Sequence, residues 1–419
     1  MFTKKLSHFS ALFLCALVLF SCSKDLTQQE FEIDQSRVRG PIGGSLSQKA
    51  MLGRKIYFDS RFSEPSGMQS CSSCHLPQMG FVGMGTVAST PTTRGFLAGI
   101  AEGAVSGAYG GRKPPSAAYA TYSPAFKMNG DEFEGGLFWD GRATGLRLGI
   151  PAAEQALGPF MNPVEQNHPS KEAVLSKIKN DPEYMSMWRS VWGNDMPLST
   201  ENEIAQNYDR IGLAIAEYEA SSEVNQFSSK YDAYTRKQVE LTSLEKQGLS
   251  LFNGKAKCEK CHDSKNNGNT PALFTDFGYE NIGLPTNIDF LNPMNRSTAA
   301  TDFGLGGILI NSQNQAWKNL ATQNMGKFRT PTLRNVAKGE YNKRFMHNGA
   351  LKSLEEVVHF YNTRDTDPTW RSPEVTMNME TGEVGNLGLS KKEELAIVAF
   401  LRTLSDGWVS SGSNRQTTL

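Results

Sequence analysis

The sequence predicts a mainly α-helical fold built from two similar halves connected by long loops. Three observations support this prediction. Each half begins and ends with a segment whose apolar residues recur at helical spacing, and each half carries one Cys-x-x-Cys-His motif. The stretch 264–330 is rich in Asn, Gly and Thr and shows little periodicity, so it is expected to form long loops. The 419 residues suffice for a leader segment and two domains of ordinary size.

Residues 1–21 are predicted to be an export signal of the lipoprotein type. Lys4 and Lys5 precede an apolar run, residues 9–20, which is too short for a comfortable membrane span. The run ends at Ser21 and Cys22 in a pattern similar to a bacterial lipoprotein cleavage site, so Cys22 is expected to become the lipidated first residue. The alternative is a simple signal peptide with an incidental Cys22. Residues 22–44 are then a flexible tether, and the predicted location is the periplasmic side of the bacterial cell envelope, with the lipid anchor as the only membrane contact.

The first half is predicted to begin with a helix at residues 47–58, with Met51, Leu52 and Ile56 on one side. It ends with a helix that opens at a capping box, Thr200-x-x-Glu203. The apolar stripe of that closing helix marks one buried face and consists of Ile204, Tyr208, Ile211, Ile215 and Tyr218.

The second half repeats this order. A capping box from Thr242 to Glu245 opens its first helix, in which Leu244, Leu249 and Phe252 are the apolar positions. A third capping box, Ser390-x-x-Glu393, opens the closing helix, whose predicted core positions are Ile397, Phe400, Leu401 and Leu404. The predicted domains are therefore residues 45–222 and 241–407, with a polar linker at 223–240 and a frayed tail at 408–419.

The two Cys-x-x-Cys-His motifs each predict one covalently attached haem c. Two thiols three positions apart on a helical turn can add to the two vinyl groups of one haem, and the adjacent His then binds the iron. The competing interpretations are a redox Cys-x-x-Cys pair and half of a zinc site, but neither needs the following His, and zinc would need a second close pair. The motif residues are Cys71, Cys74 and His75 in the first half, and Cys258, Cys261 and His262 in the second.

The far separation of the two motifs indicates one haem per half. A first helix, a haem motif and a closing helix are the minimal parts of a cytochrome c domain. The predicted fold class is therefore mainly α, with two cytochrome c-like domains, each with one covalently attached haem, and long connecting loops. Lys+Arg and Asp+Glu both number 43, and the formal net charge of zero argues against nucleic acid as a partner.

Five further segments resemble the bacterial di-haem cytochrome c peroxidase family, including its MauG-type branch. Each segment alone is a weak signal, but together they are specific, and the resemblance runs from Leu52 to Leu404, over most of the mature chain. They are Leu-Gly-Arg with Phe-Asp at 52–59, Phe-Trp-Asp-Gly-Arg at 138–142, Glu-Gln-Ala-x-Gly-Pro-x-x-Asn-Pro-x-Glu at 154–165, Arg-Thr-Pro-Thr-Leu-Arg-Asn at 329–335 and Met-His-Asn-Gly at 346–349.

The resemblance implies that the first haem is the peroxide site and the second the electron-transfer haem. It makes Glu165 the acid/base that moves a proton between the two peroxide oxygens. Gln155 would hydrogen-bond in the same pocket, and Pro159 would shape it. Trp139 would lie between the haems and carry electrons. Taken alone, Glu165 is as compatible with a helix-start carboxylate and Trp139 with a core ring.

Two departures from the family pattern concern the iron ligands. Many members block the first haem with a distal His after the attachment motif, yet residues 76–138 contain no His, so the first haem is predicted to be five-coordinate with His75 as its only protein ligand. The family's distal ligand to the second iron lies fourteen positions after the position of His347; this is Tyr361, where ordinary peroxidases have Met and MauG-type proteins have Tyr. The alternatives are a core Tyr361 with Met346 or Met325 as the ligand.

Two smaller departures concern calcium and a loop. Some members bind calcium through an Asn in an Arg-Asn-x-Pro-type stretch, and Lys113 replaces that side chain here, which argues against calcium. Residues 144–151 form an insertion that is expected to reshape the pocket entrance.

Three functions follow from these expectations. The first is a di-haem c-type peroxidase that reduces hydrogen peroxide to water with electrons from a small cytochrome or cupredoxin donor. The second is a MauG-type oxidase that uses peroxide-derived high-valent haem to oxidise Trp or Tyr of a partner protein. The third is a non-catalytic electron-transfer cytochrome. The resemblance is also compatible with a homodimer.

Overall fold

The computed structural model describes residues 45–294 and 301–410, all within one compact unit. The predicted export signal and tether (residues 1–44) and residues 411–419 of the predicted tail lie outside the described residues. None of the described helices is long and apolar enough to cross a membrane. Helices dominate the secondary structure and the strands are few and short, so the prediction of a mainly α fold is confirmed.

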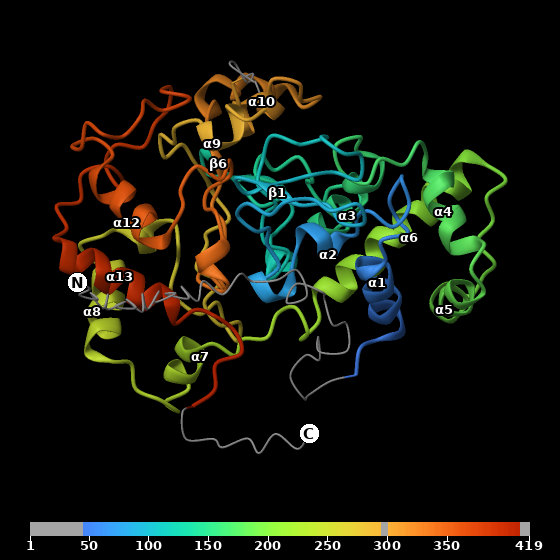
Figure 1. Cartoon of the computed structure of the whole chain (residues 1–419), viewed down its shortest axis with the longest axis horizontal. Helices are drawn as coiled ribbons and strands as arrows, with labels where there is room; N and C mark the ends of the chain where they lie inside the picture. The colour runs from blue at the N-terminus through green and yellow to red at the C-terminus, as the bar shows by residue number, and fades with distance from the viewer. Residues whose placement is uncertain (1–44, 295–300, 411–419) are drawn as a thin grey trace, which may run out of the picture. The chain divides into compact units, whose positions relative to one another are not determined.

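In Figure 1 the helices α8, α12 and α13 lie on the left and α1, α4, α5 and α6 on the right, with β1 and β6 between the two groups. The α-helices of the first half are α1 (Gln48–Phe58), α2 (Cys71–Cys74), α3 (Pro151–Met161), α4 (Lys171–Lys179), α5 (Pro182–Trp192) and α6 (Glu201–Glu219). Those of the second half are α7 (Lys230–Thr235), α8 (Ser243–Phe252), α9 (Ile288–Leu291), α10 (Gly304–Leu309), α11 (Gln315–Asn319), α12 (Leu354–Thr363) and α13 (Lys391–Arg402).

The strands form three antiparallel pairs, β1 (Phe96–Leu97) with β2 (Ile100–Ala101), β3 (Lys127–Asn129) with β4 (Glu132–Glu134), and β5 (Tyr279–Glu280) with β6 (Phe328–Arg329). In the third pair Tyr279 lies opposite Arg329, and Glu280 opposite Phe328. Single 3-10 turns complete the fold: η2 (Pro77–Met79), η3 (Ala120–Tyr122), η4 (Cys258–Lys260), η5 (Thr322–Asn324) and η6 (Glu340–Asn342).

The first and closing helices of each half pack against each other, α1 on α6 and α8 on α13. In both pairs the helices cross at a glycine, where the two backbones come into close contact. A Cβ atom on Gly53 of α1 would overlap the carbonyl oxygen of Ala214 on α6, and one on Gly248 of α8 would overlap the carbonyl oxygen of Ala396 on α13. The two halves therefore share the same close backbone contact, as the repeated order of elements suggested.

The three predicted capping boxes are confirmed. The side chains of Thr200, Thr242 and Ser390 each accept a hydrogen bond from the backbone N–H of the Glu three positions later, and the carboxylate of that Glu accepts one from the backbone N–H of the cap residue. The predicted stripes are correct in the middle of the helices and wrong at their margins. Met51 and Leu244 are 43% and 47% exposed, because the buried stripe follows the glycine contact instead.

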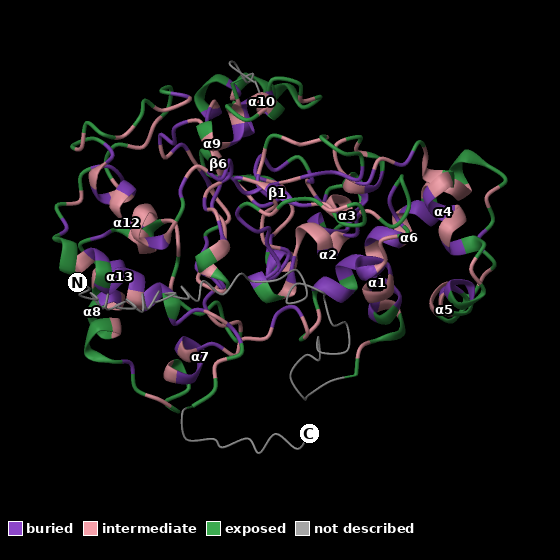
Figure 2. Cartoon of the chain, viewed as in Figure 1, coloured by how far each residue is buried: buried purple, intermediate pink, exposed green. Residues whose placement is uncertain are grey.

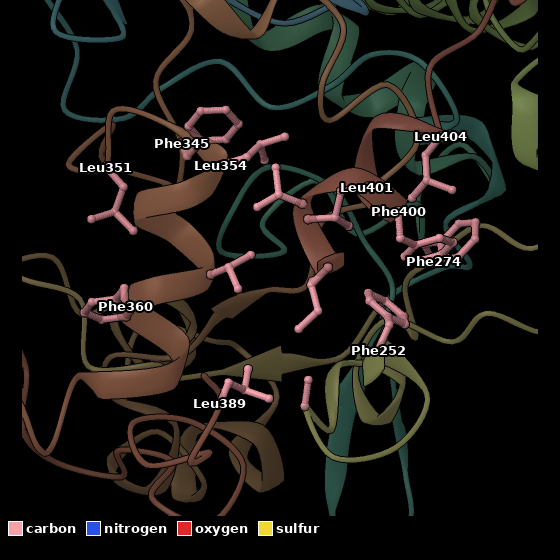
Figure 3. Close-up of a cluster of buried hydrophobic side chains, with 14 of the residues drawn as sticks. Phe252, Phe274, Phe345, Leu351, Leu354, Phe360, Leu389, Phe400, Leu401 and Leu404 are labelled. Carbon is pink, nitrogen blue, oxygen red and sulfur yellow. The ribbon is translucent and has the colours of Figure 1, made fainter. Parts of the chain in front are cut away.

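A large apolar cluster in the second half gathers side chains from α8, α12 and α13 (Figure 3). Phe252, Phe274 and Phe400 meet edge to face within it, with ring centroids 5.2–6.1 Å apart. Figure 2 shows buried and exposed stretches alternating along α13, whose predicted core positions Ile397, Phe400 and Leu401 are all buried. This cluster forms the apolar wall of the larger cavity described below.

Residues 223–240, predicted as a polar linker, include the helix α7. Asp232 on this helix forms a salt bridge with Arg334 at 2.9 Å, and both side chains are almost fully buried. The bond holds the pKa of Asp232 below its ordinary value, against the opposing effect of burial. The stretch 264–330, expected as loops, holds the short helices α9, α10 and α11, which its weak periodicity did not reveal.

Candidate active site

The first Cys-x-x-Cys-His motif lies on one wall of a cavity of about 110 Å³. Cys71 and Cys74 occupy the two ends of α2, and His75 follows the helix. Nδ1 of His75 lies 3.3 Å from the carbonyl oxygen of Phe81, which favours the tautomer with a free electron pair on Nε2. Burial lowers the pKa of His75 to about 4, so the imidazole is neutral and suited to bind a metal.

The second motif lines a larger cavity of about 190 Å³. Cys258 and Cys261 flank the turn η4, and Nδ1 of His262 lies 2.9 Å from the carbonyl oxygen of Phe274. Both cavities thus present two free thiols and one oriented, neutral imidazole, which is the donor set that haem c needs. Within residues 45–294 and 301–410 no group of three or more His, Cys, Asp or Glu side chains is placed to hold a metal ion.

The structure brings Glu165, Gln155 and Pro159 together on the wall of the first cavity. Gln155 and Pro159 lie one turn apart on α3, and Glu165 follows the end of that helix. The carboxylate of Glu165 accepts a hydrogen bond of 2.8 Å from the side chain of Asn162. Burial raises the pKa of Glu165, with Asn162 and Arg142 opposing it, so this carboxyl group can hold a proton at higher pH than an exposed one.

The insertion at residues 144–151 is not part of the wall of the first cavity, and the expectation that it reshapes the entrance stays a prediction. Its role is to fix the start of α3. The carboxylate of Glu154 accepts hydrogen bonds from the backbone N–H groups of Gly145, Arg147 and Leu148 at 2.8–2.9 Å. The loop is therefore connected to the wall of the cavity only indirectly, through the helix that carries Gln155.

Trp139 lies between the two cavities and lines both. Its indole Nε1 donates a hydrogen bond of 2.7 Å to the carbonyl oxygen of Lys113, and its ring lies edge-on to His347 with centroids 6.3 Å apart. Lys113 is buried, with Nζ 3.4 Å from the carbonyl oxygen of Pro114. Trp139 is therefore held at the boundary of the two cavities, and its place between two haems stays a prediction.

Tyr361, on α12, lines the second cavity together with His262. Its hydroxyl has no hydrogen-bond partner among the described residues, and burial raises the pKa of the phenol. Met346 also lines this cavity, whereas Met325 packs in a different apolar cluster. The geometry thus keeps Tyr361 and Met346 as candidate ligands and moves Met325 away from the site.

The first cavity offers no second protein ligand of the usual kinds. Apart from His75, its wall contains no His, Met or Tyr side chain among the described residues. The prediction that the first haem is five-coordinate stays a prediction, and this wall is the structural reason for it.

Three buried residues of the two cavities were missed by the sequence analysis as candidate site residues. Glu219 lines the first cavity, 4% exposed, and Arg329 and His347 line the second, each 7% exposed. Glu219 stands four residues after Ile215, on the buried face of α6, so a charge on a core stripe was the available signal. Arg329 and His347 belonged to segments noted for their resemblance, but no pattern indicated that their side chains share a cavity.

Comparisons with known proteins identify the family of the chain. A sequence profile described as "Di-haem cytochrome c peroxidase" matches residues 47–240. The methylamine utilization protein MauG of Paracoccus denitrificans is 32% identical over 373 residues, which cover 85% of this chain and 88% of that protein. The cytochrome-c peroxidase IdrP1 of Denitromonas iodatirespirans is 28% identical over 368 residues, covering 86% and 82%.

A solved structure shows the same fold. The crystal structure of the di-haem peroxidase BthA from Burkholderia thailandensis matches with a TM-score of 0.71 and 32% identity, covering 87% of each chain. Taken together, the profile, the MauG relative and this fold show that the chain belongs to the di-haem cytochrome c peroxidase family and is an oxidoreductase.

Proposed function

We propose that the protein reduces hydrogen peroxide to water at the first cavity, with electrons that enter through the second. The observation that supports this most directly is the buried carboxyl group of Glu165 beside Gln155 and Pro159, in the same cavity as His75. A protein that only transfers electrons does not need a side chain that holds a proton beside an accessible metal site. The overall reaction takes one peroxide, two electrons and two protons to two waters.

Each half would hold one haem c through its Cys-x-x-Cys-His motif, and the iron would supply the redox chemistry. Glu165 accepts a proton from the nearer peroxide oxygen and returns it to the leaving oxygen. Gln155 donates a hydrogen bond that orients the peroxide, and Pro159 limits the space around it. Trp139 provides an aromatic path between the cavities.

Replacement of Glu165 tests this function. For Glu165→Gln we expect kcat/KM for peroxide to fall by about 10²- to 10⁴-fold, because the amide cannot move the proton. The measurement is steady-state peroxide consumption by the holoprotein with a reduced small cytochrome as donor. Glu217→Gln, an exposed Glu on α6, is the matched control and should turn over normally. A wild-type protein inert to peroxide, or an unimpaired Glu165→Gln, would contradict the proposal.

A second candidate function is MauG-type oxidation of Trp or Tyr side chains in a partner protein. Tyr361 in the second cavity favours it, because a phenolate ligand would stabilise ferric iron more than Met does. For Tyr361→Met we expect a changed absorption and EPR spectrum of the second haem and a raised midpoint potential. Tyr234→Met, on a partly buried Tyr of the same apolar cluster, is the control. Unchanged spectra in Tyr361→Met would remove Tyr361 as the ligand.

The two functions separate by their electron source. A peroxidase needs an external donor for turnover, whereas the MauG-type oxidase holds its oxidising equivalents without a donor until a protein substrate arrives. Rapid mixing of the holoprotein with one equivalent of peroxide, without donor, distinguishes them by the lifetime of the oxidised spectrum.

The proposal also includes the domains, the electron donor and the location of the protein. We propose two cytochrome c-like domains at residues 45–222 and 241–407 and a small cytochrome or cupredoxin as electron donor. The protein would be anchored by a lipid at Cys22 on the periplasmic side of the envelope. Mass spectrometry of the mature N-terminus would test the anchor, since an unmodified Cys22 contradicts it.

A further inference from the structure

Glu219 is a buried acidic side chain of the first cavity that the proposed peroxide chemistry does not use. It lines the same wall as Cys71 and Glu165 and is almost fully buried. Glu165 accepts a hydrogen bond from Asn162, whereas the carboxyl group of Glu219 has neither a hydrogen bond nor an ion pair with any residue in the two described ranges. A buried carboxylate without a partner is costly, so this site favours the protonated form.

The backbone holds Glu219 on the cavity wall. It is the last residue of α6, the helix that packs against both α1 and α3. The backbone carbonyl oxygen of Glu219 accepts a hydrogen bond of 2.8 Å from the side chain of Asn225. The side-chain oxygen of Asn225 in turn accepts one of 2.5 Å from the backbone N–H of Tyr119. The carboxyl group is therefore placed by backbone contacts, and its own oxygens are left for the cavity.

The groups that feel the charge of Glu219 are themselves acidic or neutral. Burial raises the pKa of Tyr57 on α1 and of Cys71 on α2, and the charge of Glu219 adds to both effects. Tyr218, the preceding residue on α6, has its pKa raised in the same way, by burial first and by Glu223 and Glu219 in addition. Glu219 thus lies beside the cysteine that would attach the first haem.

No cation of the described wall neutralises Glu219. Burial raises its pKa to about 8 without an opposing charge. On the elements that pack against α6, Glu154 of α3 is bound by the loop before that helix, Tyr122 is the titratable side chain of η3, and α4 places Lys171 over Tyr208, at the far end of α6. The other ionisable side chains of the cavity wall are Cys74, His75, Arg112, Lys113, Arg142 and Glu165.

We propose that Glu219 takes up a proton from solvent when an electron reaches the haem attached at Cys71 and Cys74, and releases that proton when the electron leaves. This assignment rests on the first haem of the proposed function and adds the place where a proton is stored. One electron enters the iron and one proton enters the carboxylate, so the charge of the first half stays constant. A unit charge about 10 Å away changes the proton affinity of a buried carboxyl group by about tenfold.

The stored proton serves the reaction at the same cavity. Reduction of peroxide to two waters consumes two protons, and Glu165 only moves a proton from one peroxide oxygen to the other. A carboxyl group that gains its proton together with the electron has that proton ready for the water that forms. Glu219 is therefore a proton store of the first cavity, distinct from the acid/base Glu165.

Spectroelectrochemical titration of the holoprotein at several pH values tests this linkage. In the wild type the midpoint potential of the first haem should fall as pH rises, because charged Glu219 stabilises ferric iron. For Glu219→Gln we expect the wild-type potential at low pH and a higher potential than the wild type at high pH, since the amide never carries the negative charge. Glu219→Asp, which keeps a carboxyl group, should keep the pH dependence.

Two controls separate this effect from a general one. Glu217→Gln removes an exposed Glu of the same helix and should follow the wild type at every pH. The second haem is an internal control, because Glu219 is not on the wall of the second cavity. Glu219→Gln should therefore leave the pH dependence of the second potential unchanged.

Infrared difference spectra between reduced and oxidised holoprotein identify the group that binds the proton. On reduction, the wild type and Glu165→Gln should both show the C=O stretching band of a newly protonated carboxyl group, and Glu219→Gln should lack it. Absence of this band from the wild type would overturn the proposal without any variant. So would a band that survives in Glu219→Gln, or a potential in that variant displaced equally at every pH. Neither readout uses peroxide, so a failure of the peroxidase function would be seen separately, in turnover.

Discussion

Glu219 shows how one buried side chain couples the first cavity to the stability of the protein. Its carboxyl group lies on the cavity wall without a hydrogen bond or ion pair to a described residue. Burial alone raises the pKa of Glu219 to about 8. The folded protein thus keeps a proton that the unfolded chain releases near the ordinary glutamate pKa.

This difference predicts a pH dependence with a definite sign. Below the ordinary pKa both states are protonated and Glu219 has no effect. Between that value and about 8 the folded state binds more protons, so stability falls as pH rises, and the loss is complete above pH 8. Glu219→Gln should remove a penalty on the order of a few kcal/mol at high pH.

The thermal unfolding midpoint of the holoprotein, followed across this pH window, checks the prediction. The curve for Glu219→Gln should be flatter than that of the wild type, whereas the exposed neighbour variant Glu217→Gln should follow the wild type. Parallel curves for Glu219→Gln and the wild type would show that the carboxyl group finds a partner in the holoprotein.

At the scale of helices, the sequence predicted where helices begin better than it predicted which of their residues contact another helix. Capping boxes are local, so Thr200, Thr242 and Ser390 marked helix starts correctly. Which residue of a helix contacts the partner helix depends on a segment more than a hundred residues away, so the sequence predicted neither the glycine contacts nor the exposure of Met51.

The same distinction applies to the site. The haem motifs and the family-like segments located Glu165, Gln155, Pro159, Trp139 and Tyr361, which the structure gathers at two cavities. Glu219 joins them from α6. Its role depends on three-dimensional burial and on the absence of a partner, and neither property is written in a local motif.

The glycine crossings give a prediction at the element scale. Alanine is the better helix former by about 1 kcal/mol, so Gly→Ala within an open helix face should stabilise. At Gly53 and Gly248 the added methyl group meets a backbone carbonyl, which cannot move aside without separating the helices. We expect Gly53→Ala and Gly248→Ala each to destabilise by about 1–3 kcal/mol.

Chemical denaturation of each variant measures this effect. Gly111→Ala serves as the control, because nothing lies within 4 Å of its added Cβ atom. A lowered denaturation midpoint in both helix variants, with the control unchanged, supports the two equivalent crossings. Gly248→Ala at wild-type stability would show that the second half tolerates a wider helix separation.

Across the whole molecule, Trp139 takes part in several of the contacts between the two halves. Its carbonyl oxygen accepts from the N–H of Arg329, and its indole donates to Lys113, whose own N–H donates to His347. Arg112, next to Lys113, binds Asp140 and Asp302, one from each half. Arg329 and His347 line the second cavity. They are thus linked by hydrogen bonds, directly or through Lys113, to Trp139, which also lines the first cavity.

From this arrangement we predict that Trp139 affects the rate of electron transfer between the two sites more than it affects the structure of either site. Trp139→Phe keeps an aromatic ring but loses the indole and leaves the buried Lys113 carbonyl oxygen unpaired, at a cost of about 1–3 kcal/mol. We expect slower delivery of electrons from the second site to the peroxide-oxidised first site, with the spectra of both resting haems unchanged.

Stopped-flow mixing of reduced holoprotein with peroxide resolves that transfer. Trp188→Phe is the matched control, since this fully buried Trp of α5 has a comparable indole bond, to Asn194, and borders neither cavity. Both variants lose an indole hydrogen bond, so a general loss of stability would slow both. If only Trp139→Phe transfers electrons more slowly, the indole of Trp139 is the path. If Trp139→Phe transfers electrons at the wild-type rate, they cross elsewhere.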